Sequence, residues 1–144
     1  MRFIHIADIH ASRERLSQTL SILNTLTERC KQGDIDFIVF AGDFWDSTIT
    51  ATKGSGFSDI ISAIRELEKY TFLFFIYGTP THEPSGSLAG FVSEKTIVID
   101  SMQNIIKPIL TGNGYETVKI VCIPEPRRSN YVGGSISETD TRIN

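Results

Sequence analysis

Cysteine, histidine and basic charge are all scarce in this 144-residue chain. Its two cysteines, Cys30 and Cys122, stand in no metal-binding spacing, which excludes a cysteine-based zinc motif. We interpret both as reduced core residues of a cytosolic protein, with a disulfide in a secreted protein as the alternative. The net charge of −3 gives no indication of binding to nucleic acid or to an acidic membrane. A local basic patch or a partner subunit can still supply positive charge, so DNA binding stays open.

Long apolar runs are also missing from the sequence. No stretch approaches the roughly 20 residues that a membrane-spanning helix needs. The N-terminal segment MRFIHIAD is too short and too polar for a signal peptide. The length suits one domain with one core. We therefore predict a soluble, cytoplasmic domain with no membrane partner.

The order of the apolar patterns predicts an α/β fold. Buried strands are expected at 2–7, 36–41 and 71–77. Between them, apolar residues recur every three or four positions, which predicts one helix that has Ser12 as its N-cap and a second one over 57–67. Short strands should follow near 96–99, 105–110 and 117–123, the last two forming a hairpin or an antiparallel edge around Gly112–Gly114. The start of the chain thus reads βαβαβ, which is typical of a parallel sheet.

Polar residues follow each of the first three predicted strands. In open α/β sheets, ligands bind beyond the carboxyl ends of the strands. Because these strands are expected to be neighbours, the loops that follow them should converge. The three groups of residues are Asp8 and His10, then Asp43 and Asp46, then Thr79, Thr81, His82 and Glu83.

These residue types suit a metal site. Side chains at positions i and i+2 of an extended segment point the same way, so Asp8 and His10 can hold one cation together. The two oxygens of Asp43 can bridge that cation to a second one. A shell of nitrogen and carboxylate ligands suits Mn²⁺, Fe²⁺ or Zn²⁺ better than Ca²⁺. Two such ions polarise a phosphate and generate a nucleophile, and His82 is placed to contact the phosphate or to protonate the leaving oxygen.

Each feature also has a simpler interpretation. Asp8 and His10 can be a loop cap, and Asp43 can belong to a turn that binds its own backbone. We interpret His5, which lies between two isoleucines, as a packed, hydrogen-bonded core histidine. Phe44 and Trp45 are expected to pack beneath their loop and not to contact a substrate. The order and placement of the three groups together favour the metal site.

Three segments of the chain resemble a known family. FIHIADIH, AGDFWD and YGTPTHE are similar to the first three motifs of calcineurin-like metallophosphoesterases, whose pattern is D-x-H, G-D-x-x-D and G-N-H-D/E. The wording of the first two, together with IPEP at 123–126, is most similar to the SbcD-type nuclease subunits of DNA double-strand-break repair. The resemblance implies the N-terminal part of a phosphoesterase β-sandwich flanked by helices over 1–126. Residues 127–144 are then a polar tail or an unfinished loop.

The resemblance also implies roles for individual residues. Asp8 and His10 would bind the first metal, Asp43 would bridge both metals, and His82 would be the catalytic histidine. Asp46 would orient a ligand. The asparagine of the family, a ligand to the second metal, has no equivalent in the longer GTPTHE segment, where Thr81 is the candidate replacement.

The resemblance implies a metal-dependent phosphodiesterase of SbcD type that uses Mn²⁺ and acts on double-stranded DNA. Its expected partners are a coiled-coil ATPase of SbcC type and a second copy of the chain in a homodimer. The later histidine ligands of the family have no counterpart here, because no histidine follows His82. We therefore expect the N-terminal half of a longer enzyme, incomplete alone. The alternatives are the same chemistry on a nucleotide, cyclic dinucleotide or phosphoprotein, a non-catalytic module with a vestigial site, and a receiver-like phosphoacceptor domain that uses Asp8 or Asp43.

Overall fold

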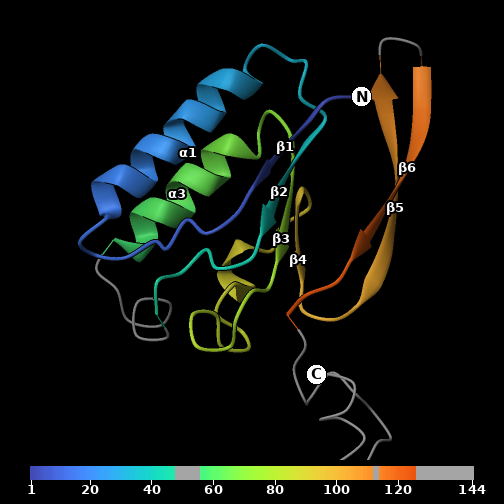
Figure 1. The fold of residues 1–144 in the computed structure, drawn as a ribbon. Coiled ribbons are helices and arrows are strands. Elements are labelled where there is room, and N and C mark those ends of the chain that lie inside the picture. The colour runs from blue at the N-terminus through green and yellow to red at the C-terminus, as the bar shows by residue number, and fades with distance from the viewer. Residues whose placement is uncertain (48–55, 112–113, 126–144) are drawn as a thin grey trace, which may run out of the picture.

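A four-stranded parallel sheet forms the centre of the molecule in a computed structural model, which describes residues 1–47, 56–111 and 114–125 (Figure 1). The strands lie in the order β1-β2-β3-β4, and every neighbouring pair is parallel. The predicted α/β fold with a βαβαβ start is confirmed. The strand bounds are β1 (Phe3–Ile6), β2 (Phe37–Ala41), β3 (Phe72–Ile76) and β4 (Thr96–Ile99).

Two helices cover one face of this sheet, α1 (Leu16–Cys30) and α3 (Phe57–Leu67) (Figure 1). Their apolar faces enter one core with β2, β3 and the short 3₁₀ helix η1 (Ala89–Phe91). The expected N-cap is wrong by three residues, because Arg15 and not Ser12 precedes the first residue of α1. The Ser12 hydroxyl nevertheless accepts a hydrogen bond from the Arg15 N–H at 3.3 Å, so it stabilises the approach to the helix.

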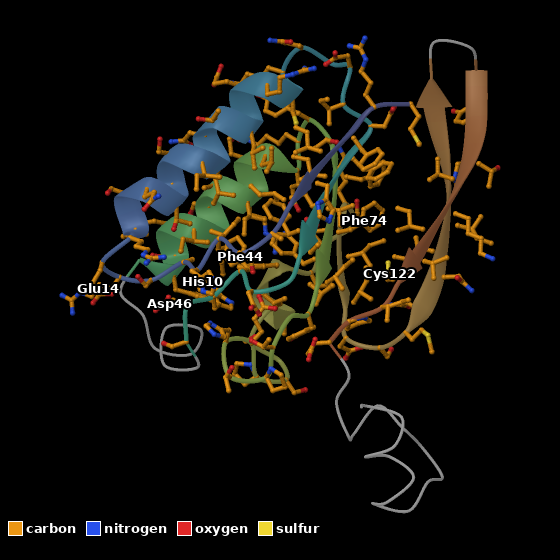
Figure 2. The ribbon with its side chains drawn as sticks, in the orientation of Figure 1. His10, Glu14, Phe44, Asp46, Phe74 and Cys122 are labelled. Atoms are coloured by element: carbon orange, nitrogen blue, oxygen red, sulfur yellow. The ribbon has the colours of Figure 1, made fainter. Side chains whose placement is uncertain are left out.

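A β-hairpin covers the opposite face of the sheet (Figure 1). Its strands, β5 (Gln103–Thr111) and β6 (Gly114–Cys122), pair antiparallel as a second sheet of their own. This confirms the predicted hairpin. Figure 2 shows Phe74 and Cys122 on this side of the sheet, where both are buried in a second apolar cluster. Cys122 and Cys30 are both free and buried, as predicted.

The prediction of a buried His5 is wrong. Side chains alternate along β1, so that Ile4 and Ile6 pack toward the helices, whereas Phe3 and His5 face the hairpin side and are exposed. The hairpin leaves a groove over this edge strand, and His5 is one of its lining residues. The isoleucines on either side of His5 in the sequence lie on the opposite face of the strand. They therefore gave no information about the burial of His5 itself.

The loop after β2 is anchored by its two aromatic residues. Phe44 and Trp45 are 2% and 1% exposed, and their rings contact each other edge to face with a centroid distance of 5.1 Å. Phe44 also packs against Phe75 and Phe91 in the helix-side core. This confirms that both aromatic residues support the loop from beneath.

Two expectations lie outside the described residues: the polar tail over 127–144 and most of the Gly112–Gly114 turn. Within the described part of the chain, no helix combines the length and the apolar character needed to cross a membrane.

Candidate metal centre

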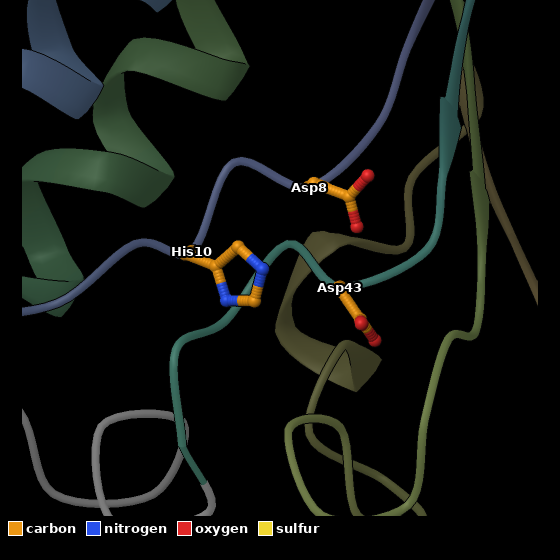
Figure 3. A group of neighbouring side chains, drawn as sticks. All are labelled: Asp8, His10 and Asp43. Atoms are coloured by element: carbon orange, nitrogen blue, oxygen red, sulfur yellow. The ribbon is translucent and has the colours of Figure 1, made fainter.

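The polar loops after β1, β2 and β3 meet at one edge of the sheet, as the strand order requires. Asp8, His10 and Asp43 each place one ligand atom in a group whose members all lie within 4.8 Å of one another (Figure 3). Asp8 is exposed, whereas His10 and Asp43 are half-buried. The structure therefore brings together one imidazole and two carboxylates from two separate loops.

The backbone at all three positions is in the left-handed region. The φ angles are 55° at Asp8, 49° at His10 and 51° at Asp43. This corrects the expectation that residues 8–10 are extended. Left-handed residues turn the chain sharply, so the side chains converge by local coiling and not by the alternation of a strand. Such a conformation is sparsely populated by residues other than glycine and clusters at functional sites.

Main-chain hydrogen bonds hold the first two loops against each other beyond the ends of their strands. The Asp8 N–H donates to the Gly42 carbonyl at 3.2 Å, and the His10 N–H donates to the Asp43 carbonyl at 3.1 Å. The Ala11 N–H then donates to the Phe44 carbonyl at 2.7 Å. These bonds compensate part of the strain and fix the spacing of the ligand-bearing residues without any side chain.

The third loop contacts Asp43 through Thr79. Asp43 Oδ1 accepts hydrogen bonds from the Thr79 N–H at 2.7 Å and from the Thr79 hydroxyl at 3.0 Å. Gly78 permits this approach, because an added Cβ there would collide with the Asp43 carboxylate and backbone nitrogen. Thr81, the residue expected to help with a second metal, is exposed, and its hydroxyl lies 3.4 Å from the Thr79 hydroxyl.

Glu83 ties the second loop to the third, a role that the sequence did not reveal. Its side chain is fully buried. One carboxylate oxygen accepts the Phe44 N–H at 2.6 Å, and the other accepts the Gly78 N–H at 2.6 Å. Burial raises the pKa of this carboxyl, and the N–H donors oppose the rise. The only available signal was an acidic residue directly after His82. Its Gly78 partner is five residues away, but its Phe44 partner is 39 residues away, so the link between the two loops could not be foreseen.

His82 lies beside the group of three, as predicted. Its ring meets the His10 ring edge to face, with 4.8 Å between centroids. Its Nδ1 atom is buried and has no hydrogen-bond partner among the described residues. Buried polar atoms are nearly always paired, so this nitrogen is left for a partner outside the described residues.

Asp46 lies next to His10, the ligand that it was expected to orient. The Asp46 Oδ1 and the His10 Nδ1 are 3.7 Å apart, too long for a hydrogen bond. The Asp46 N–H donates to the Ala11 carbonyl at 3.0 Å, which anchors its backbone beside the first loop. Its orienting role stays a prediction.

The donor set fits a divalent transition metal. One imidazole and two carboxylates are the mixed ligands that Mn²⁺, Fe²⁺ and Zn²⁺ accept, and the three donors are already gathered in space. The His82 ring, whose Nδ1 has no partner among the described residues, lies beside the His10 ring of this donor set.

A comparison with known protein families agrees with this geometry. Residues 1–90, which include all three polar loops, match the family described as calcineurin-like phosphoesterase. No curated protein matches the chain. The family is one of divalent-metal-dependent phosphoesterases, and its match covers more than half of the sequence. The chain therefore belongs to the calcineurin-like phosphoesterase family.

Proposed function

We propose that the chain supplies the metal-binding loops of a phosphodiesterase, with Asp8, His10 and Asp43 as metal ligands. The observation that carries this proposal is the convergence of these three donors within 4.8 Å. Their loops lie within the segment that matches a phosphoesterase family. Mn²⁺ is the ion that we propose, because it accepts both nitrogen and carboxylate ligands.

The chain's own residues divide the work of the reaction. A bound divalent cation supplies Lewis acidity to the phosphate ester. Thr79 keeps the Asp43 carboxylate in place by two hydrogen bonds. His82, beside His10, is the proposed catalytic residue, which contacts the phosphate or gives a proton to the leaving oxygen. Asp46 would limit the movement of the His10 ring from the side.

The finer proposal is a DNA nuclease subunit of SbcD type that works with a coiled-coil ATPase of SbcC type in double-strand-break repair. Its support is the similarity of the FIHIADIH, AGDFWD and IPEP segments to that subset. The chain carries a net charge of −3, so the partner subunit would supply much of the attraction to the DNA backbone.

The test compares the natural full-length protein with its Asp43→Asn variant in Mn²⁺-dependent hydrolysis of bis-p-nitrophenyl phosphate. Asparagine keeps an oxygen that can accept both Thr79 hydrogen bonds but loses the charge. We expect at least a roughly 100-fold loss of activity with an unchanged circular dichroism spectrum. The matched control is Asp59→Asn, an exposed position on α3.

Retained hydrolysis by the Asp43→Asn variant would place the site elsewhere. A second arm supplies linear duplex DNA, mononucleotides and a phosphopeptide. Hydrolysis of the small diester without degradation of DNA would contradict the nuclease assignment alone. Binding of Mn²⁺ without any hydrolysis would instead identify a non-catalytic module.

A further inference from the structure

A pocket of about 270 Å³ opens on one side of the Asp8–Asp43 pair. Its wall includes Gly78 and Thr79 from the third loop, and it also includes Glu125, which follows the hairpin. Three acidic residues from distant parts of the chain, Asp8, Asp43 and Glu125, therefore line one small space. The residues described along its wall include no lysine or arginine. Their mutual repulsion is relieved by a cation.

Glu125 is held at this pocket by its backbone. Its N–H donates to the Tyr77 carbonyl at 3.2 Å, and the Tyr77 N–H donates in turn to the Ile99 carbonyl at 3.0 Å. Cys122 and Pro124, on the same segment, are buried. The chain thus returns from β6 to the carboxyl end of β3 and presents Glu125 at the rim of the metal centre.

The Glu125 carboxylate is free to act as a ligand. It is exposed and makes no hydrogen bond or ion pair within the part of the chain that the structure describes. Asp43 Oδ1, by contrast, already accepts two hydrogen bonds from Thr79. A cation on this side of Asp43 consequently has few unshared protein oxygens, and Glu125 is the remaining carboxylate that lines the pocket.

We propose that Glu125 is a ligand of a divalent cation on the pocket side of Asp8 and Asp43. The inference rests on the proposed metal centre and assigns it a donor outside the three loops. The acidic residues in this wall offer oxygen ligands, which favour a hard ion such as Mn²⁺ or Mg²⁺. Glu125 lies beyond residues 1–90, so the family match does not itself assign it this role.

The experiment titrates Mn²⁺ into the natural full-length protein and into its Glu125→Gln and Glu94→Gln variants by calorimetry. Glu94 is an exposed glutamate that lines a different pocket, which makes it a matched control. Glutamine keeps the size of the side chain and removes its charge. We expect Glu125→Gln to weaken the binding of one Mn²⁺ ion at least about 10-fold and Glu94→Gln to leave it unchanged.

A second variant, Glu125→Lys, places an ammonium group at the rim of the pocket and should weaken that ion further. The electron paramagnetic resonance spectrum of bound Mn²⁺ provides a readout independent of activity, and it should differ between the parent protein and Glu125→Gln. Equal affinities and equal spectra would overturn the role of Glu125 while leaving the metal centre intact. Absence of Mn²⁺ binding by the parent protein would overturn the metal centre itself, and this inference with it.

Discussion

Three residues other than glycine adopt a positive φ within the described part of the chain, and they are the three candidate metal ligands. A side chain in the left-handed region costs roughly 1–2 kcal/mol, less for aspartate than for most residues. The fold therefore accepts strain at Asp8, His10 and Asp43. Glycine would adopt the same φ angles with less strain. The presence of aspartate and histidine at these positions therefore indicates that their side chains have a function, because the backbone does not need them.

This strain predicts an unusual order of stabilities at Asp8. Glycine adopts the left-handed region without penalty, so Asp8→Gly should be more stable than Asp8→Ala by about 1 kcal/mol. Asp8 is exposed, so neither change removes buried contacts. Chemical denaturation without metal measures the difference.

Asn24, exposed in the middle of α1, provides the opposite case. There Asn24→Gly should be less stable than Asn24→Ala by about 1 kcal/mol. The same sign at both positions would mean that Asp8 is not strained in solution.

The sequence predicted which residues would meet but not how. Asp8, His10 and Asp43 could be named because parallel strands bring their following loops to one edge. Their backbone conformation could not be foreseen, since strand periodicity carries no information about a residue just past the strand. Thr79 and Glu83 were missed as supports because their partners are 36 and 39 residues away.

Among the secondary-structure elements, a cluster of charges joins α1 to β1 at the opposite end of the sheet from the metal centre. Asp34, after α1, accepts hydrogen bonds from Arg29 in the last turn of the helix and from Arg2 just before β1. The Arg29 guanidinium, helped by Arg2, holds the pKa of Asp34 well below its ordinary value of 3.8. The ionised carboxylate is therefore the form that the folded chain favours.

This pKa predicts how the contribution of Asp34 depends on pH. A carboxyl group whose pKa is lower in the folded state stabilises the fold above its unfolded pKa, near 3.8, and loses that effect as the pH falls toward the lowered folded value. Asp34→Asn should lower the thermal midpoint at pH 7, and the difference from the parent protein should shrink progressively below pH 4. Thermal unfolding followed from pH 7 to pH 2 measures this, with Glu14→Gln as an exposed control. A difference that stays constant over the whole range would contradict the pairing.

On the scale of the whole molecule, the sheet separates two apolar clusters. Phe74 packs with Cys122 on the hairpin side, whereas its neighbour Phe75 packs with Phe44 on the helix side. Adjacent residues of β3 therefore stabilise different layers. The helix layer could be predicted from its periodic apolar residues. The groove at His5 could not, because the position of the hairpin over β1 depends on contacts between segments that are distant in sequence.

The two layers should respond separately to matched substitutions. Phe74→Leu and Phe75→Leu each remove ring atoms from a buried position and should cost about 1–3 kcal/mol. We expect Phe74→Leu to speed the hydrogen exchange of the β5 and β6 amides more than that of the α3 amides. Phe75→Leu should produce the reverse order. Equal acceleration of both layers by both variants would show that the molecule opens only as a single unit.

The main-chain hydrogen bonds between the first two loops affect how the protein would take up and release a metal ion in the cell. Because the Asp8, His10 and Ala11 amides are already bonded to the neighbouring loop, the ligands are arranged before any ion arrives. In many small metal proteins, by contrast, binding and folding are one event. If the proposed site binds an ion, that ion would be able to leave to a chelator and return without refolding of the chain. Its occupancy would follow the changing supply of free ion and would not be fixed when the chain is made.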